Sequence, residues 1–258
     1  MSGPGQNDWN PETYARFRGL RLRPALDLLW QVGELPEGWV IDLGCGDGAA
    51  APALKQRYPM HHLIGLDASP AMLAKAKGYD QVIEADAALW QAATPPALIF
   101  SNAALHWLPD HAGLMPRLAE MLAPGGVLAV QMPRQYFAPS HRFLRDIAAA
   151  LFPDRFDFAR YEAPVQTAQA YWQILSPLGQ VQSWETEYLQ RLDPVSDMHP
   201  VRAFTQSTAM RPFMEKLNAA EAQAFVTAYD QALTSAYPLL PDGACLMPFR
   251  RVFFTLKV

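Results

Sequence analysis

Residues 40–48 read VIDLGCGDG, a short apolar run that passes directly into three alternating glycines. An apolar run of this length that ends in glycine predicts a buried β-strand, and the residues from Ala49 onward favour a helix. Glycines in such a strand-to-helix turn let the backbone turn tightly and come close to a ligand. A lone glycine-rich turn is weak evidence of function, so its setting in the chain decides what it means.

Further apolar runs of the same kind follow, separated by segments with helical spacing. We expect strands at 39–43, 62–67, 81–86, 97–101 and 127–132. Buried strands that alternate with helices predict a parallel sheet covered on both faces, with ligand outside the carboxyl ends of the strands. The predicted fold class is α/β, a doubly wound, Rossmann-like sheet.

The second half of the chain has a different pattern, with helices expected at 143–152 and 168–175 and over most of 201–237. Strand patterns return at 181–189 and 249–258. We therefore expect one domain over 1–258, with an N-terminal helical lid at 1–33 and a cofactor-binding core at 34–132. Cap segments would occupy 133–180 and 190–248, and the two late strands would complete the sheet.

Composition excludes several classes of function. The formal net charge of −4 provides no basic field for nucleic acid. Two cysteines suit a reducing compartment, and neither a signal peptide nor an apolar run of membrane-spanning length is present, so a cytoplasmic protein without membrane partners is expected. The histidines show no metal-binding spacing, so no metal is expected.

Acidic residues end three successive strands. Asp67 lies 25 residues after Asp42 and can accept hydrogen bonds from both ribose hydroxyls of a nucleoside. Asp86, followed by Ala87, can accept from an adenine amino group, although a solvated carboxylate there is about equally plausible. The third glycine comes one residue too early for a dinucleotide fingerprint, and Asp42 and Asp47 would repel pyrophosphate. These carboxylates suit a cationic ligand such as S-adenosylmethionine.

These motifs resemble those of the class I methyltransferases. Residues 42–48 are similar to their first motif, 65–69 to their ribose-binding segment, and 122–128 to the segment ahead of their fifth strand. The resemblance implies a seven-stranded sheet whose last two strands are antiparallel, with S-adenosylmethionine as cofactor. The cofactor-binding residues that it implies are Asp42, Gly44, Cys45, Gly46, Asp67, Ala68, Met72, Asp86, Ala87 and Asn102.

A narrower resemblance, to the bacterial trans-aconitate methyltransferases, covers nearly the whole chain. It rests on residues 9–25, 101–111, 131–134, 199–201, 210–213 and 248–251. It implies methyl transfer to one carboxylate of a small polyacid, forming a monomethyl ester. Asp47, where proline is commoner, and Gln135, where asparagine is frequent, depart from the family pattern. A turn that acts through its backbone should tolerate Asp47.

A carboxylate is already a nucleophile at neutral pH, so this reaction needs alignment and exclusion of water more than a general base. A polyanionic substrate needs fixed cations, and the candidates are Arg134, Arg211, Arg250 and Arg251. Neighbours in a strand point to opposite faces, so at most one of the adjacent pair 250–251 should face the site. For each arginine taken alone, a position on the solvated surface is as plausible as a role in binding the substrate.

Two further groups are candidates. His106 can donate a hydrogen bond to the acceptor carboxylate while Trp107 walls the pocket, or the two can be a structural pair beneath the next helix. Arg21 can pair with the cofactor carboxylate while Trp9 and Tyr14 close over it, or it can be a solvated residue of an amphipathic helix.

Competing functions remain open from the sequence. A malonyl group on an acidic carrier protein is an alternative acceptor, although no basic docking rim is evident. A nicotinamide-dependent oxidoreductase is disfavoured by the glycine spacing, and a non-catalytic nucleotide-binding module would not need the cap arginines. A nucleic-acid methyltransferase is disfavoured by the net charge and by residues 101–104, which lack an Asn/Asp-Pro-Pro-aromatic signature.

Overall fold

The structure, a computed structural model, describes residues 18–158 and 161–258, without the side chains of 18–21. The chain divides into two compact units, each assembled from separate segments. We call residues 18–133, 164–186 and 251–258 the sheet unit, and residues 134–158, 161–163 and 187–250 the helical unit. The expected single domain with two cap segments stays a prediction.

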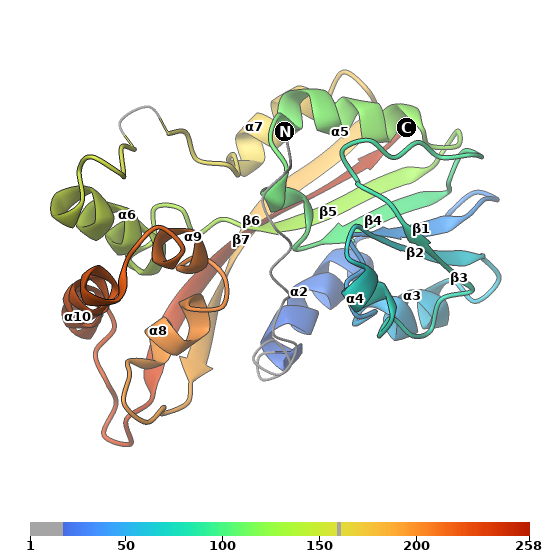
Figure 1. Cartoon of the computed structure of the whole chain (residues 1–258). Helices are drawn as coiled ribbons and strands as arrows, with labels where there is room; N and C mark the ends of the chain where they lie inside the picture. The colour runs from blue at the N-terminus through green and yellow to red at the C-terminus, as the bar shows by residue number, and fades with distance from the viewer. Residues whose placement is uncertain (1–17, 159–160) are drawn as a thin grey trace. The chain divides into compact units, whose positions relative to one another are not determined.

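The strands form one seven-stranded sheet in the order β3-β2-β1-β4-β5-β7-β6 (Figure 1). Their bounds are β1 Val40–Leu43, β2 Leu63–Asp67, β3 Gln81–Glu84, β4 Leu98–Asn102, β5 Val127–Pro133, β6 Gln180–Leu192 and β7 Cys245–Lys257. Parallel pairs join β1 to β2 and β4, β2 to β3, and β4 to β5, whereas β7 runs antiparallel to β5. The α/β fold class predicted from the sequence is confirmed.

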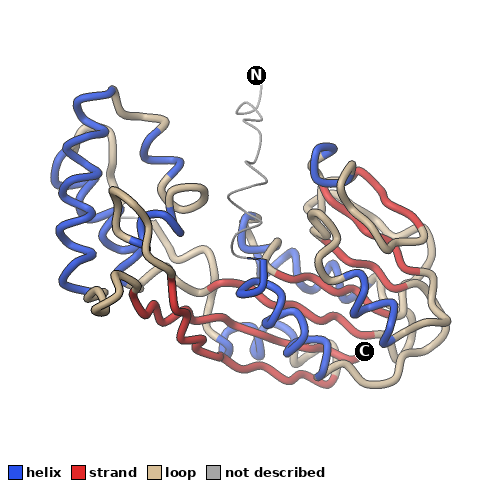
Figure 2. Tube along the Cα trace, turned by 90° about the horizontal axis from the view of Figure 1, so that it is seen from below, coloured by secondary structure: helices blue, strands red, loops and turns tan. Residues whose placement is uncertain are grey.

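Helices cover both faces of the sheet in the sheet unit. Figure 1 shows α5 (His111–Glu120) and α7 (Ala168–Leu175) on one face, and α2 (Arg18–Trp30) and α3 (Ala51–Arg57) on the other. Strands covered on both faces are largely apolar, as the fully buried β1 and nearly fully buried β5 illustrate, with Asp42 and Gln131 as their polar members. Figure 2 shows the same strands in red, seen from below.

Two late aromatic residues complete the core of the sheet unit. Phe253 and Phe254 of β7 are fully buried and point to opposite faces of the sheet. Phe253 stacks on Trp184 with ring centroids 5.0 Å apart, and Phe254 stacks on Tyr171 at 4.8 Å. The last strand is therefore part of the core and not an addition to its edge.

Local sequence explains where the short helix after β2 begins. The Ser69 side chain accepts from the Met72 N–H, and Pro70 takes the first helical position. This helix, α4 (Pro70–Leu73), is a single turn, and the chain turns again at Gly78, which has φ of 89°.

The helical unit is built around α6 (Pro139–Leu151) and α10 (Ala219–Ala236), with the shorter α8 (Pro200–Thr205) and α9 (Arg211–Met214). A capping box between Asn218 and Glu221 starts α10. Phe225, Tyr229 and Leu233, spaced four residues apart, form its buried face. The Tyr229 hydroxyl donates to the Ser140 carbonyl of α6 at 2.6 Å.

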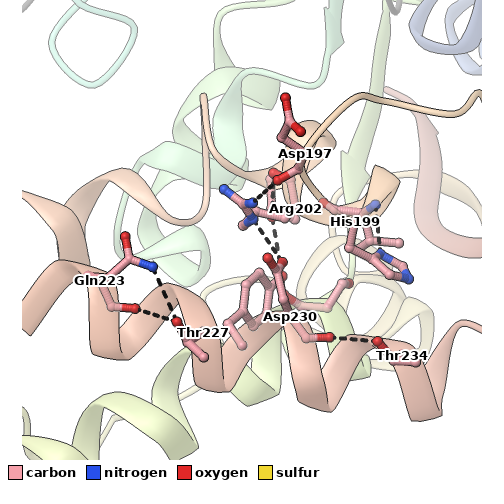
Figure 3. Close-up of polar contacts among 11 residues, drawn as sticks. Asp197, His199, Arg202, Gln223, Thr227, Asp230 and Thr234 are labelled. Carbon is pink, nitrogen blue, oxygen red and sulfur yellow. Dashed lines mark hydrogen bonds and ion pairs between the residues drawn. The ribbon is translucent and has the colours of Figure 1, made fainter.

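One ion pair ties α8 to α10 inside the helical unit (Figure 3). Arg202 Nε donates to Asp230 Oδ1 at 2.8 Å, and a second guanidinium N–H of Arg202 donates to the Asp197 carbonyl. Asp197 has φ of 63°, so its carbonyl lies in a left-handed turn. Both partners are partly buried, so solvent screens this pair less than a fully exposed one.

Candidate functional site

The glycine turn lies where the sequence predicts it, directly after β1. Gly44, Gly46 and Gly48 all have positive φ, of 77°, 56° and 84°. A Cβ on Gly44 would lie 2.1 Å from the Cβ of Ala104, so the turn requires glycine to pass the end of β4. The Gly44 and Cys45 N–H groups both donate to the Leu66 carbonyl, which ties the turn to β2.

Asp67, at the end of β2, is held by the turn that it faces. Its Oδ2 accepts from the Gly46 N–H and its Oδ1 from the Ser69 N–H, both at 2.9 Å. A carboxylate has about four lone-pair positions, so both oxygens can still accept ribose hydroxyls. Met72 lies beside Gly46, because a Cβ there would be 3.2 Å from the Met72 methyl carbon. Ala68 lies between Asp67 and Ser69 in the chain.

Asp42, at the end of β1, is a buried carboxyl group with only 2 % of its surface exposed. Its pKa is raised to about 7: burial raises it most, a hydrogen bond from Tyr79 opposes this, and the negative charge of Asp67 adds a smaller increase. Burial, with the nearby Asp42 and Asp67, also raises the pKa of the Cys45 thiol. Cys45 is therefore a neutral thiol that lines the turn, and it is not an activated nucleophile.

The segment after β3 is held by an arginine from α5. Arg117 donates to the Ala87 and Trp90 carbonyls at 2.8 and 2.7 Å. The Asp86 carboxylate accepts from the Ala88 N–H at 2.8 Å and is otherwise on the surface. This arrangement fixes the backbone of the segment predicted to contact adenine.

The last residue of β4, Asn102, carries a buried amide oxygen. The Asn102 Oδ1 atom is buried and, among the described residues, accepts no hydrogen bond. Ala103, which follows it, has φ of 53°, and its N–H donates to the Gln131 carbonyl. A buried, unsatisfied acceptor at the carboxyl end of a strand is a signature of a ligand site.

His106 and Trp107 lie in the next turn, the 3-10 helix η1 (Leu105–Trp107), with ring centroids 4.7 Å apart. Trp107 is 57 % exposed, so it is not a packed core residue. His111 holds this turn: its Nε2–H donates to the Leu105 carbonyl, and its Nδ1 accepts from the Tyr171 hydroxyl at 2.6 Å. Burial lowers the pKa of His111, so its imidazole ring stays neutral, with the proton on Nε2.

The adjacent arginines of β7 point to opposite faces, as strand geometry requires. Arg251, in the sheet unit, is 3 % exposed, and its guanidinium donates to the buried Gln131 Oε1 at 3.3 Å. Arg250, in the helical unit, is exposed and pairs with Glu187 at 3.5 Å.

The other two candidate arginines belong to the helical unit. Arg134 follows β5, and its N–H donates to the Arg250 carbonyl at 2.9 Å. Arg211 begins α9 and pairs with Glu215 of the same helix at 3.5 Å. Trp9 and Tyr14 lie outside the described residues, and Arg21 is described only by its backbone in α2.

Three functional contacts escape a reading of the sequence. Tyr79 donates to Asp42, His111 holds η1, and Gln135 joins two strand ends. The buried Gln135 accepts from the Arg250 N–H and donates to the Pro248 carbonyl, so its amide continues the ladder where β5 stops. The Tyr79–Asp42, His111–Tyr171 and Gln135–Pro248 contacts each join residues far apart in sequence, and no local pattern marks them.

Among residues 18–158 and 161–258, no group of three or more His, Cys, Asp and Glu side chains is arranged to hold a metal ion. No helix in that part of the chain is long and apolar enough to cross a membrane. The site consists instead of a glycine turn, two carboxylates beside it and an unsatisfied amide oxygen. These groups fit a nucleoside with a positively charged tail, such as S-adenosylmethionine, better than a diphosphate.

The strand order, with an antiparallel β7 inserted beside β5, and the acidic glycine turn define an α/β methyltransferase domain. A family profile described as a methyltransferase domain matches residues 14–187. Trans-aconitate 2-methyltransferases match over nearly the whole chain. That of Methylobacterium radiotolerans is 41 % identical over 97 % of this chain and 98 % of its own, and that of Shigella flexneri 39 % over the same shares. The chain belongs to the trans-aconitate 2-methyltransferase family.

Solved structures agree at the level of the fold. The YcgJ protein of Bacillus superposes with a TM-score of 0.56 at 15 % identity, covering 91 % of this chain and 98 % of its own. Phosphoethanolamine N-methyltransferase 2 of Haemonchus contortus, in complex with S-adenosylhomocysteine, has a TM-score of 0.51 at 15 % identity, covering 91 % and 52 %. At such identities the likeness concerns the architecture of the sheet and not the substrate.

Proposed function

We propose that this protein transfers the methyl group of S-adenosylmethionine to a carboxylate of trans-aconitate, forming a monomethyl ester. The similarity to trans-aconitate 2-methyltransferases at about 40 % identity over nearly full length carries this conclusion. The acidic glycine turn supports it independently, because the cofactor is a cation without phosphate. The proposed substrate is therefore a small acid and not a nucleic acid. We also propose that the protein acts in the cytoplasm.

The cofactor is held by the turn between β1 and α3 and by the strand ends beside it. Asp67 accepts the ribose hydroxyls, with Ala68 and Met72 beside it, and the backbone around Asp86 and Ala87 receives the adenine. Gly44, Cys45 and Gly46 allow close approach of the backbone. Asp42 and the Asn102 Oδ1 atom face the positively charged tail. When bound, S-adenosylmethionine supplies a methyl group that its sulfonium makes electrophilic.

The acceptor needs orientation and not deprotonation, because a carboxylate is already nucleophilic at neutral pH. Arg251 is a guanidinium held in the sheet unit by Gln131, which suits it to bind a carboxylate. His106 donates to the acceptor, and Trp107 excludes water. The sequence also predicts Arg134, Arg211 and Arg250 as carboxylate ligands and Trp9, Tyr14 and Arg21 as cofactor contacts, and these stay predictions.

The test is methyl transfer from labelled S-adenosylmethionine. Trans-aconitate would be offered beside cis-aconitate, citrate, isocitrate and a malonyl carrier protein. Base-labile label on trans-aconitate, with little on the other acids, is the expected result. Label on the carrier alone would assign the other acceptor, and no label on any acid would refute carboxyl methylation.

A further inference from the structure

A tyrosine distant in sequence from the first motif lies against the glycine turn. Tyr79 follows Gly78 in the segment between α4 and β3. Its hydroxyl donates to Asp42 Oδ2 at 2.6 Å, across 37 positions of sequence. Both residues belong to the sheet unit, so one compact body holds the contact.

The ring of Tyr79 also restricts Gly65 of β2. A Cβ on Gly65 would lie 2.9 Å from the ring atoms Cδ2 and Cε2. Such a distance is below van der Waals contact, so this position does not accept a side chain while the ring stays in place. A Cβ on Gly48 would lie 2.9 Å from the Lys77 carbonyl oxygen and 3.1 Å from Cε2 of the ring, so the ring borders the turn as well. Tyr79 therefore packs the space between β2 and the turn as well as binding Asp42.

The charges near Asp42 work against its ionised form. Burial and the like charge of Asp67, at the end of the neighbouring strand, both raise the pKa of Asp42. The turn itself contributes two titratable side chains, Cys45 and Asp47. Cys45, which lies near Asp42, is a neutral thiol. The Tyr79 O–H opposes these effects, because it donates to the charged form of the carboxyl group.

We propose that Tyr79 is a positioning residue for the cofactor, whose hydroxyl keeps the Asp42 carboxylate ionised and oriented toward the cationic tail of S-adenosylmethionine. This inference rests on the proposed cofactor site. Burial and the neighbouring Asp42 raise the pKa of Tyr79, so its hydroxyl stays protonated and continues to donate through the alkaline range.

The experiment measures binding of S-adenosylhomocysteine by calorimetry between pH 6 and 9.5. It compares the wild type with Tyr79→Phe, which keeps the ring and removes only the hydroxyl. The matched control is Tyr58→Phe, since Tyr58 is also largely buried in the sheet unit and its hydroxyl donates to the Val32 and Gly33 carbonyls, away from the glycine turn. Titration of the ligand is common to all three proteins and cancels in the ratio of their Kd values.

A hydrogen bond to a charged group is worth about one pKa unit or more, so its loss leaves fewer carboxylates ionised. The Kd of Tyr79→Phe should exceed that of the wild type about tenfold at pH 6 and about fivefold at pH 7, and match it near pH 9.5. Tyr58→Phe should bind like the wild type throughout.

Other outcomes separate the two proposals. Equal Kd values for Tyr79→Phe and the wild type at pH 7, or a ratio that is constant with pH, would overturn the role of the hydroxyl. A wild-type protein that binds neither S-adenosylhomocysteine nor S-adenosylmethionine would instead refute the proposed function itself.

Discussion

Replacing Asp42 by asparagine should stabilise the free protein at neutral and alkaline pH while weakening cofactor binding. Burial raises the pKa of this carboxyl group from 3.8 to about 7, a shift of about three units worth about 4 kcal/mol. The folded state therefore holds a proton that the unfolded state releases between about pH 4 and pH 7. Over that range the free energy of unfolding falls as pH rises, and above it the full penalty is present.

Asparagine has nearly the same shape, can still accept from Tyr79 and carries no charge to desolvate. The difference in free energy of unfolding between Asp42→Asn and the wild type should therefore grow from pH 4.5 to pH 7.5. It should then level off, with a total change on the order of 4 kcal/mol. Urea unfolding at one-unit steps from pH 4.5 to 8.5 measures this, because contributions of all other groups cancel between the two proteins.

Asp80 provides a control of opposite sign. Its pKa is lowered by the Leu63 N–H and by Lys55, so its charge is favourable in the folded state. Asp80→Asn should lower stability above about pH 4 and change it less in acid. A difference for Asp42→Asn that does not vary with pH, or a wild type that is the more stable protein at pH 8, would refute the reasoning about Asp42.

Two other substitutions test the packing of the turn and the choice between the paired arginines. Gly65→Ala must displace the Tyr79 ring and should cost about 1–3 kcal/mol in urea unfolding, whereas Gly33→Ala, which meets nothing within 4 Å, should cost little. Equal losses of stability in the two variants would show that the ring is easily moved. The second substitution concerns substrate binding: Arg251→Lys should raise the KM for trans-aconitate about tenfold or more without changing the KM for the cofactor, because lysine lacks the bidentate fork. Arg250→Lys, on the exposed face, should change it little, and equal effects in both variants would remove the preference for Arg251.

The local sequence was enough to predict most of the strands in the sheet unit. Apolar runs predicted β1 to β5 to within a few residues, and burial on both faces explains why β1, β2, β4 and β5 are largely apolar. The region 201–237, expected to be mostly helical, is divided into α8, α9 and α10. β6 (Gln180–Leu192) extends beyond the expected 181–189, and β7 (Cys245–Lys257) begins before the expected residue 249. Pairing with a neighbouring strand, and not the propensity of single residues, sets where a strand begins and ends.

The sequence by itself also predicted the central residues of the site. The glycine turn, Asp42 and Asp67 all lie at the ends of strands that the apolar runs predict. It predicted as well that Arg250 and Arg251 face opposite ways, since that follows from the pleat alone. Only the tertiary structure decided which of the two is buried and that Tyr79 reaches Asp42. Such contacts depend on how strands and loops pack in three dimensions, and the spacing of residues along one segment carries no record of them.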